Sequence, residues 1–285
     1  MKKILLLGSA GMAGQILKVE LTKLKDKIEL VDIAKSNQIT TPTIQLDVTK
    51  FDELKDIIID GKFDYIINCV GLLNSFAEKN PDQAILINSY FPHYLEKITA
   101  ELPTRLIHIS TDCVFSGISG NYIESDFKDG IGFYAQSKSL GEIINNKDLT
   151  IRTSIIGPDL NKNGIGLFSW VLNQKGTING YTNAFWSGVT TIQLANVIIK
   201  FILGPSCPTG LIHLTNNTKI SKYNLLRTIK DVFELNNLDI EEYNNYIIDK
   251  SFISTRDDVD FNLPSYLDMI QIMKDWIVQN KYPLT

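Results

Sequence analysis

The chain has 285 residues, of which 44% are hydrophobic and 21% charged, and its formal net charge is −4. That length fits one or two soluble domains with a sizeable core. The acidic balance disfavours general binding to nucleic acid or to anionic membranes, which requires a basic excess. The three cysteines (Cys69, Cys113 and Cys207) are too few for a disulfide framework and indicate a reducing compartment, and the scattered histidines predict no metal site.

No targeting segment is expected at the N-terminus. The apolar run at residues 4–7 ends at Gly8 and is too short for the apolar region of a signal peptide. No stretch approaches the ~18 apolar residues of a membrane span. We therefore expect a cytoplasmic protein with no membrane partner.

Short apolar runs alternate with amphipathic stretches through the first half of the chain. This alternation is typical of a parallel sheet covered by helices on both faces, and it predicts a Rossmann-type, doubly wound α/β fold. The expected strands are 3–7, 28–31, 43–46, 65–70, 105–110 and 149–153, and the expected helices are 12–24, 52–59, 81–102 and 133–145.

The pattern changes after Thr153. Residues 157–166 are rich in Gly, Asn and Pro and predict a loop. A helix is expected at 167–172, another at 192–203, a strand at 211–214 and at least two helices in 221–285. We infer a dinucleotide-binding domain from residues 1–153, with a return segment at about 191–219. A smaller, mostly helical substrate lobe is then expected from 154–190 and 220–285.

A glycine-rich turn follows the first predicted strand and opens the first helix. Its residues Gly8, Gly11, Met12 and Gly14 lie in a GxxGxxG spacing. Glycines at such a place allow a tight turn and the close approach of a pyrophosphate, whose charge the helix N-terminus stabilises. Because the turn comes directly after a strand at residue 4, it predicts dinucleotide binding more strongly than an isolated glycine motif would.

Two carboxylates end the next strands. Asp32 closes the second strand, where a carboxylate can accept both ribose hydroxyls and repels a 2′-phosphate. This favours NAD over NADP only slightly, since Lys35 lies nearby. Asp47 ends the third strand and is expected either near the adenine edge or as the cap of the next helix.

Tyr134 and Lys138 form a YxxxK pair on one face of a predicted helix. A nearby ammonium is expected to lower the tyrosine pKa and so to suit the phenol to proton transfer. The pair alone is not specific, because Tyr246 and Lys250 repeat it. Thr111 stands at the end of the fifth strand, where ligands of open α/β sheets bind, and there it would offer a hydroxyl to the oxygen that Tyr134 serves.

The chain resembles the extended short-chain dehydrogenase/reductases, and within them the dTDP-4-dehydrorhamnose reductase-like group. The resemblance covers nearly the whole chain and is strongest up to about residue 160. The segments that carry it are 8–14 (GSAGMAG), 68–71 (NCVG), 87–88 (IN), 110–117 (STDCVFSG), 134–142 (YAQSKSLGE) and 149–158 (LTIRTSIIGP), with weaker echoes at 210–214 and 254–260.

The resemblance implies an NAD(P)H-dependent reductase of a nucleotide-activated 4-keto-deoxysugar, used in surface polysaccharide synthesis. It implies that Tyr134 donates a proton to the C4 oxygen, that Thr111 bonds the same oxygen and that Lys138 binds the nicotinamide ribose. Val70 and Gly71 would then approach the cofactor. The chain departs from the family at Cys113, where a tyrosine is common, and at residues 187–190, which carry no proline.

Two residues beyond the cofactor half are candidates for substrate contact. Trp186 ends an aromatic and amide-rich turn and is expected either to stack on the substrate or to fill the core. Arg256 is expected either to clamp a diphosphate or to form a surface ion pair. Cys113 is interpreted as a packing residue because no histidine in its motif would activate the thiol.

Two further functions stay open at this point. A nucleotide-sugar epimerase uses the same Tyr and Lys, and the family also contains a non-catalytic dinucleotide-binding regulatory subunit. The complete set of Thr111, Tyr134 and Lys138 argues against the regulatory subunit. The resemblance also implies a homodimer formed through the helices at 81–102 and 133–145.

Overall fold

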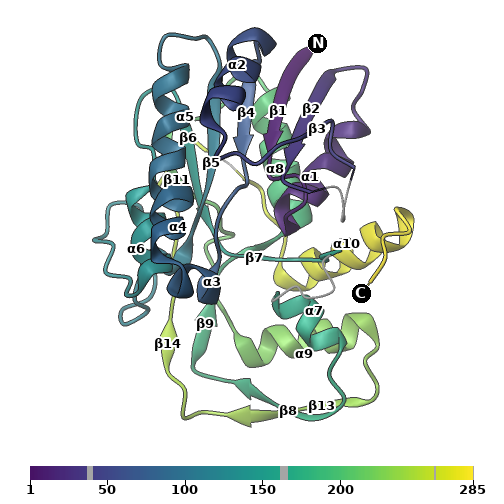
Figure 1. Cartoon of the computed structure of the whole chain (residues 1–285). Helices are drawn as coiled ribbons and strands as arrows, with labels where there is room; N and C mark the ends of the chain where they lie inside the picture. The colour runs from purple at the N-terminus through teal and green to yellow at the C-terminus, as the bar shows by residue number, and fades with distance from the viewer. Residues whose placement is uncertain (37–40, 161–165, 260, 285) are drawn as a thin grey trace.

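The structure is a computed structural model, and it describes residues 1–36, 41–160, 166–259 and 261–284. Its largest part is a seven-stranded sheet in which every neighbouring pair is parallel (Figure 1). The prediction of a doubly wound parallel sheet is confirmed. In spatial order the strands are β11 (Gly210–His213), β6 (Leu149–Thr153), β5 (Arg105–Thr111), β4 (Tyr65–Asn68), β1 (Lys2–Leu7), β2 (Ile28–Ala34) and β3 (Ile44–Gln45).

Alternate side chains of the sheet build two separate cores. Ile4 and Leu6 pack with the core under α1 (Met12–Thr22) and α8 (Thr191–Leu203). Leu5 and Leu7 belong to the other core, with buried residues of α2 (Phe51–Gly61) and α5 (Phe91–Thr99). Since a strand is buried on both faces, it reads as an unbroken apolar run, which is why residues 4–7 could be recognised from sequence.

The strand order reverses direction between β1 and β4. The chain runs outward through β2 and β3 on one side of β1, then returns to β4 and continues through β5 and β6 on the other. Ligands of open α/β sheets bind beside the carboxyl ends of the strands at such a switch point. The segments that leave these ends begin at Gly8, Lys35, Cys69 and Asp112.

The second lobe contains more strands than predicted. Beside the expected helices, short strands of the described residues form three small sheets in this region. The two longest of these strands are polar and largely exposed, and the others have only two or three residues, so none carries the long apolar signal of a buried strand. They are β7 (Ile155–Ile156) with β10 (Val189–Thr190), β8 (Gly176–Tyr181) with β13 (Leu238–Tyr243), and β9 (Ala184–Trp186) between β12 (Ile220–Ser221) and β14 (Ile248–Asp249).

The described residues of this region also form three helices: α7 (Leu167–Leu172), α9 (Lys222–Phe233) and α10 (Tyr266–Gln279). They agree with the helices expected at 167–172 and within 221–285. The loop predicted at 157–166 lies partly outside the described residues, since 161–165 are not among them. The division of the chain into two domains stays a proposal.

The helix expected over 81–102 is interrupted. It consists of α4 (Pro81–Ala84), the π-helical segment η1 (Ile85–Tyr90) and α5, and a short helix α3 (Asn74–Lys79) precedes it. Within η1 the buried Asn88 side chain accepts from the Leu72 N–H (2.8 Å) and donates to the Leu72 carbonyl (2.9 Å). These bonds tie η1 to the loop after β4, and a wider helical turn at such a place is typical of a functional site.

Helix α6 (Phe133–Leu140) is shorter than predicted and packs tightly on η1. A Cβ atom at Gly141, just after the helix, would lie 1.8 Å from the Asn88 carbonyl oxygen, so only glycine fits there. No helix in the described ranges is both long and apolar enough to cross a membrane.

Candidate active site

The glycine turn lies between the end of β1 and the start of α1. Gly8 has φ = 85°, a conformation that favours glycine, and a Cβ atom at Gly14 would lie 2.1 Å from the Gly8 carbonyl oxygen. Gly14 therefore allows α1 to pack closely on the turn. No side chain caps the N-terminus of α1 at Gly11, so the first N–H groups of the helix remain available to an anion.

A pocket of about 400 Å³ opens beside this turn at the carboxyl ends of β1, β2, β3 and β4. Loops after four strands form the pocket, and the glycine turn in its lining suits a pyrophosphate. Of the predicted cofactor residues, those that line the pocket are Gly8, Gly11, Asp47, Val70 and Gly71. Met12 and Gly14 are not in its lining. Gly14 instead packs against the backbone of the turn at Gly8.

Asp32 does not face this pocket. Its carboxylate is bonded to the Lys18 ammonium (2.8 Å) and to the Thr43 N–H and hydroxyl (3.1 and 2.8 Å). Burial raises the pKa of Asp32, but these bonds and one from Ser9 lower it by more. The role of ribose ligand predicted for Asp32 is therefore corrected: the side chain points to the α1 face of the sheet, and it lines a separate hollow with Lys18 and Thr43.

Lys35 and Asp47, and not Asp32, line the wall of this pocket after β2 and β3. The Lys35 ammonium lies 2.9 Å from the Asp47 carboxylate, and 81% of the Lys35 side chain is exposed. Asp47 also accepts from the Thr49 N–H and hydroxyl, so it holds the turn before α2 while it lines the pocket. Asp47 is not the cap of α2, whose N-cap residue is Lys50, and its place near an adenine edge stays a proposal.

Thr111 and Tyr134 meet at the carboxyl end of β5. Burial and the nearby Cys113 and Asp112 raise the pKa of Tyr134 above its ordinary value, and the Thr111 hydroxyl opposes this rise. The Glu78 carboxylate accepts from the N–H groups of Phe133 and Tyr134 (3.2 and 3.1 Å) and so fixes the start of α6. The phenol is consequently held as a proton donor beside a second hydroxyl.

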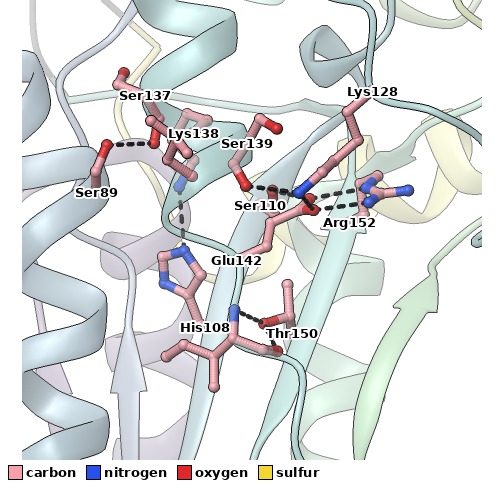
Figure 2. Close-up of polar contacts among 12 residues, drawn as sticks. Ser89, His108, Ser110, Lys128, Ser137, Lys138, Ser139, Glu142, Thr150 and Arg152 are labelled. Atoms are coloured by element: carbon pink, nitrogen blue, oxygen red, sulfur yellow. Dashed lines mark hydrogen bonds and ion pairs between the residues drawn. The ribbon is translucent and has the colours of Figure 1, made fainter.

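Lys138 lies one turn further along α6, on the same face. Its ammonium donates to the Ile109 carbonyl (2.7 Å) and lies 3.4 Å from the His108 imidazole (Figure 2). Burial lowers the pKa of Lys138 to about 8. The expectation that Lys138 depresses the Tyr134 pKa is not met, because the Lys138 side chain is turned toward β5 and the Tyr134 pKa is raised.

A buried ion pair holds the end of α6 against the sheet. Arg152 on β6 makes two bonds to Glu142 (both 2.7–2.8 Å), and Ser110 on β5 donates to the same carboxylate (2.7 Å) (Figure 2). Lys128 contacts Glu142 and the Ser139 carbonyl from the other side. This network links the strand that carries Thr111 to the helix that carries Tyr134 and Lys138.

Comparison with known proteins identifies the family. The sequence profile of the RmlD substrate binding domain family matches residues 1–246. The chain belongs to this family. The family predicted from the motifs is thereby confirmed, and with it the prediction of an NAD(P)-dependent reductase of the extended short-chain type.

Three similar proteins illustrate the RmlD-family relationship. A dTDP-4-dehydrorhamnose reductase of Aggregatibacter actinomycetemcomitans is 26% identical over 241 residues, which are 81% of this chain and 79% of that protein. The Bacillus subtilis spore coat polysaccharide biosynthesis protein SpsK is 30% identical over 59% of this chain and 62% of its own. The crystal structure of the Bacillus anthracis dTDP-4-dehydrorhamnose reductase in complex with NADP has the same fold, with a TM-score of 0.80, 20% identity, and coverage of 97% and 99% of the two chains.

The two substrate residues predicted for this RmlD-family chain are not at the site. Trp186 is 3% exposed and packs in the core against Tyr266, so it offers no face for stacking. Arg256 is bonded to Asp258 (2.6 and 2.7 Å) and to the carbonyls of Thr209 and Leu211. Because Gly210 begins β11, Arg256 lies near the amino end of the sheet, opposite Thr111.

Lys222 is a functional candidate that the sequence did not reveal. It begins α9, its ammonium lies 5.5 Å from the Trp186 ring centre, and it faces Asp112 and Cys113 next to Thr111. Burial lowers its pKa, and among the described residues no carboxylate forms an ion pair with it. No motif surrounds Lys222, so only the fold could place it there.

Cys113 is held as a thiol. Burial and the neighbouring Asp112 raise its pKa to about 11, which agrees with a packing residue rather than a nucleophile. Within the described ranges no group of three His, Cys, Asp or Glu side chains is arranged to hold a metal ion.

Proposed function

We propose that this chain is an NAD(P)H-dependent reductase of a nucleotide-activated 4-keto-deoxysugar, acting in polysaccharide or deoxysugar biosynthesis. The observation that carries the proposal is the pair of hydroxyls, Thr111 and Tyr134, at the same carboxyl edge of the sheet as the pocket beside the glycine turn. The names of the reductase and polysaccharide proteins similar to this chain support the same substrate class.

The chain's residues divide the work between binding and proton transfer. Gly8, Gly11, Val70, Gly71 and Asp47 would hold the cofactor, which supplies the hydride when bound.

As negative charge develops on the C4 oxygen, the Tyr134 phenol gives that oxygen its proton and the Thr111 hydroxyl donates a hydrogen bond to it. The raised pKa of Tyr134 keeps the phenol protonated until that charge appears.

A substrate assay tests this proposal directly. Purified protein is expected to oxidise NADPH or NADH when a dTDP-linked 4-keto-6-deoxysugar is added. The loss of absorbance of the reduced nicotinamide measures this oxidation. Interconversion of two nucleotide sugars without net oxidation would indicate the epimerase instead. Cofactor binding without any turnover across a panel of such sugars would indicate the regulatory subunit.

Lys35 supports the use of NADPH. With Asp32 bonded to Lys18 on the other side of β2, Lys35 is the one cation among the described residues that line the pocket, and it can turn from Asp47 to a 2′-phosphate. Lys35→Ala is expected to raise the KM for NADPH about tenfold, roughly 1.4 kcal/mol, and to leave the KM for NADH nearly unchanged.

Lys50→Ala is the control for Lys35, because Lys50 is exposed, pairs with Glu53 and is outside the pocket lining. Equal effects of Lys35→Ala on the two cofactors would contradict the assignment and return the preference to NAD.

Lys222 is proposed to bind the substrate's diphosphate in place of Trp186 and Arg256. A cation that faces the reacting end of β5 without a carboxylate partner among the described residues suits an anionic ligand. Lys222→Met is expected to raise the KM for the nucleotide sugar about 10–100-fold without changing the Kd of the cofactor. Lys230→Met is the control on the same helix, because the Lys230 ammonium pairs with Asp239 at the surface, and it should change neither value. Equal KM values for the Lys222→Met and Lys230→Met variants would exclude Lys222 from the site.

A homodimer and a cytoplasmic location remain proposals. Large apolar side chains are exposed on and beside α3, α4 and α6, which supports a second copy of the chain as the partner of this face. They are Leu73, Phe76, Ile85, Phe133, Leu140 and Ile144.

A further inference from the structure

Three buried polar side chains form a row beneath the active site. Asn68 ends β4, His108 is in the middle of β5 and Lys138 is on α6, and they are 0%, 0% and 5% exposed. The Asn68 amide nitrogen lies 3.1 Å from His108 Nδ1, and His108 Nε2 lies 3.4 Å from Lys138 Nζ (Figure 2 shows the second contact). None of the site motifs assigns a role to Asn68 or His108.

The hydrogen bonds fix which nitrogen of His108 carries the proton. The Val70 N–H donates to Asn68 Oδ1 (3.0 Å), so the Asn68 amide is oriented with its NH₂ group toward His108. Nδ1 must then accept, and the single proton of a neutral imidazole is on Nε2. The ring is neutral because burial and the charges of Lys138 and His93 hold its pKa well below the ordinary value.

Lys138 consequently faces an N–H group and not a lone pair. An ammonium is also a donor only, so the contact with His108 Nε2–H becomes favourable when Lys138 releases a proton and its amine accepts. Glu142, after α6, is a charged group near Lys138 that favours the ammonium, whereas burial opposes it. Cys69, after β4, is a neutral thiol, because burial raises its pKa to about 12.

We propose that Asn68 and His108 are positioning residues that present an N–H to Lys138 and thereby make its ammonium proton readily exchangeable in the reaction. This proposal rests on the proposed reductase function. After Tyr134 has given its proton to the substrate oxygen, the tyrosinate regains a proton from water, and an N–H bond of the Lys138 ammonium breaks and re-forms with water in that exchange.

Nuclear magnetic resonance on the cofactor-free protein tests the arrangement without any turnover. In ¹⁵N-histidine-labelled protein, His108 is expected to show a protonated Nε2 and an unprotonated Nδ1 at neutral pH. His213 is an internal reference with the opposite tautomer, because its Nδ1–H donates to the Ile253 carbonyl (2.9 Å) and its Nε2 accepts from Arg152 (2.7 Å). A His108 with a protonated Nδ1, or an imidazolium, would overturn the proposal.

Asn68→Asp is expected to reverse the direction of the hydrogen bonds between residue 68, His108 and Lys138. The carboxylate still accepts from the Val70 N–H but now also accepts from His108 Nδ1–H, so Nε2 offers its lone pair to the Lys138 ammonium. In ¹³Cε-lysine-labelled protein the Lys138 titration, assigned with Lys138→Arg, is expected near pH 8 in the wild type and about one unit higher in Asn68→Asp. The basic limb of the kcat profile should move with it.

The double variant Asn68→Asp/His108→Phe separates the imidazole from the added charge. If the double variant shifts the Lys138 titration as far as Asn68→Asp does, His108 does not transmit the effect and the proposal fails. If neither variant folds, the wild-type tautomer of His108 decides. Because the spectra need no substrate, a failed reductase assay with the expected spectra would count against the reductase function and not against the arrangement.

Discussion

Tyr134→Phe is expected to lower kcat by about 10²–10⁴-fold, because it removes the phenolic proton donor from the reacting oxygen. Thr111 remains in the variant and still offers its hydroxyl to the substrate, so the KM for the nucleotide sugar should change much less than kcat. Steady-state kinetics with the 4-keto sugar give both values. The Kd of the cofactor, measured by nicotinamide fluorescence, should be unchanged, because the pocket lining does not include Tyr134.

Tyr246→Phe is the matched control. Tyr246 and Lys250 repeat the YxxxK spacing, but Tyr246 is 47% exposed and contacts the Tyr181 ring. The control variant should retain wild-type kcat. A Tyr134→Phe variant as active as the Tyr246→Phe variant would exclude Tyr134 as the proton donor and reopen the regulatory or epimerase interpretation.

The candidate site residues that lie where the sequence predicted are those whose place in the fold follows from chain order alone. Gly8 and Thr111 stand directly after buried strands, and in a parallel sheet the carboxyl ends of all strands lie along one edge. Tyr134 reaches that edge because α6 follows β5 and must pack back on the sheet. The apolar runs and their helical connections therefore carried both the fold and the centre of the site.

The residues that were placed wrongly depend on register and on the path of distant segments. Asp32 pairs with Leu6, whose side chain lies on the α1 face, and the sequence gives no pairing register that would reveal this. The position of Arg256 depends on the course of the chain after β14. The burial of Trp186 depends on its contact with Tyr266, a residue far away in the sequence. The role proposed for Lys222 depends on the same tertiary path.

Glu142→Gln is expected to destabilise the protein by about 3–5 kcal/mol, since it leaves the Arg152 guanidinium buried without a carboxylate. Arg152 and Glu142 are 1% and 0% exposed at their side chains, and the lost charge also weakens the contacts of Glu142 with Ser110 and Lys128. The free energy of unfolding in urea measures the effect. Lys230→Gln, which removes a surface pair with Asp239, should cost no more than about 1 kcal/mol.

The pH dependence of the wild type gives an independent view of the same network. Burial raises the pKa of Glu142, but Arg152 and Lys128 lower it by more, so the folded-state pKa lies below the unfolded one. The stabilisation by Glu142 is therefore present above the unfolded pKa and is lost as the pH falls through the folded pKa. The difference in stability between wild type and Glu142→Gln should accordingly shrink in acid. Two results would contradict this role of Glu142: a stability difference that stays constant through the acid range, or a difference at pH 7 no larger than that of Lys230→Gln. Either result would mean that the Glu142 carboxylate does not hold β5, β6 and α6 in the geometry on which Tyr134 and Lys138 depend.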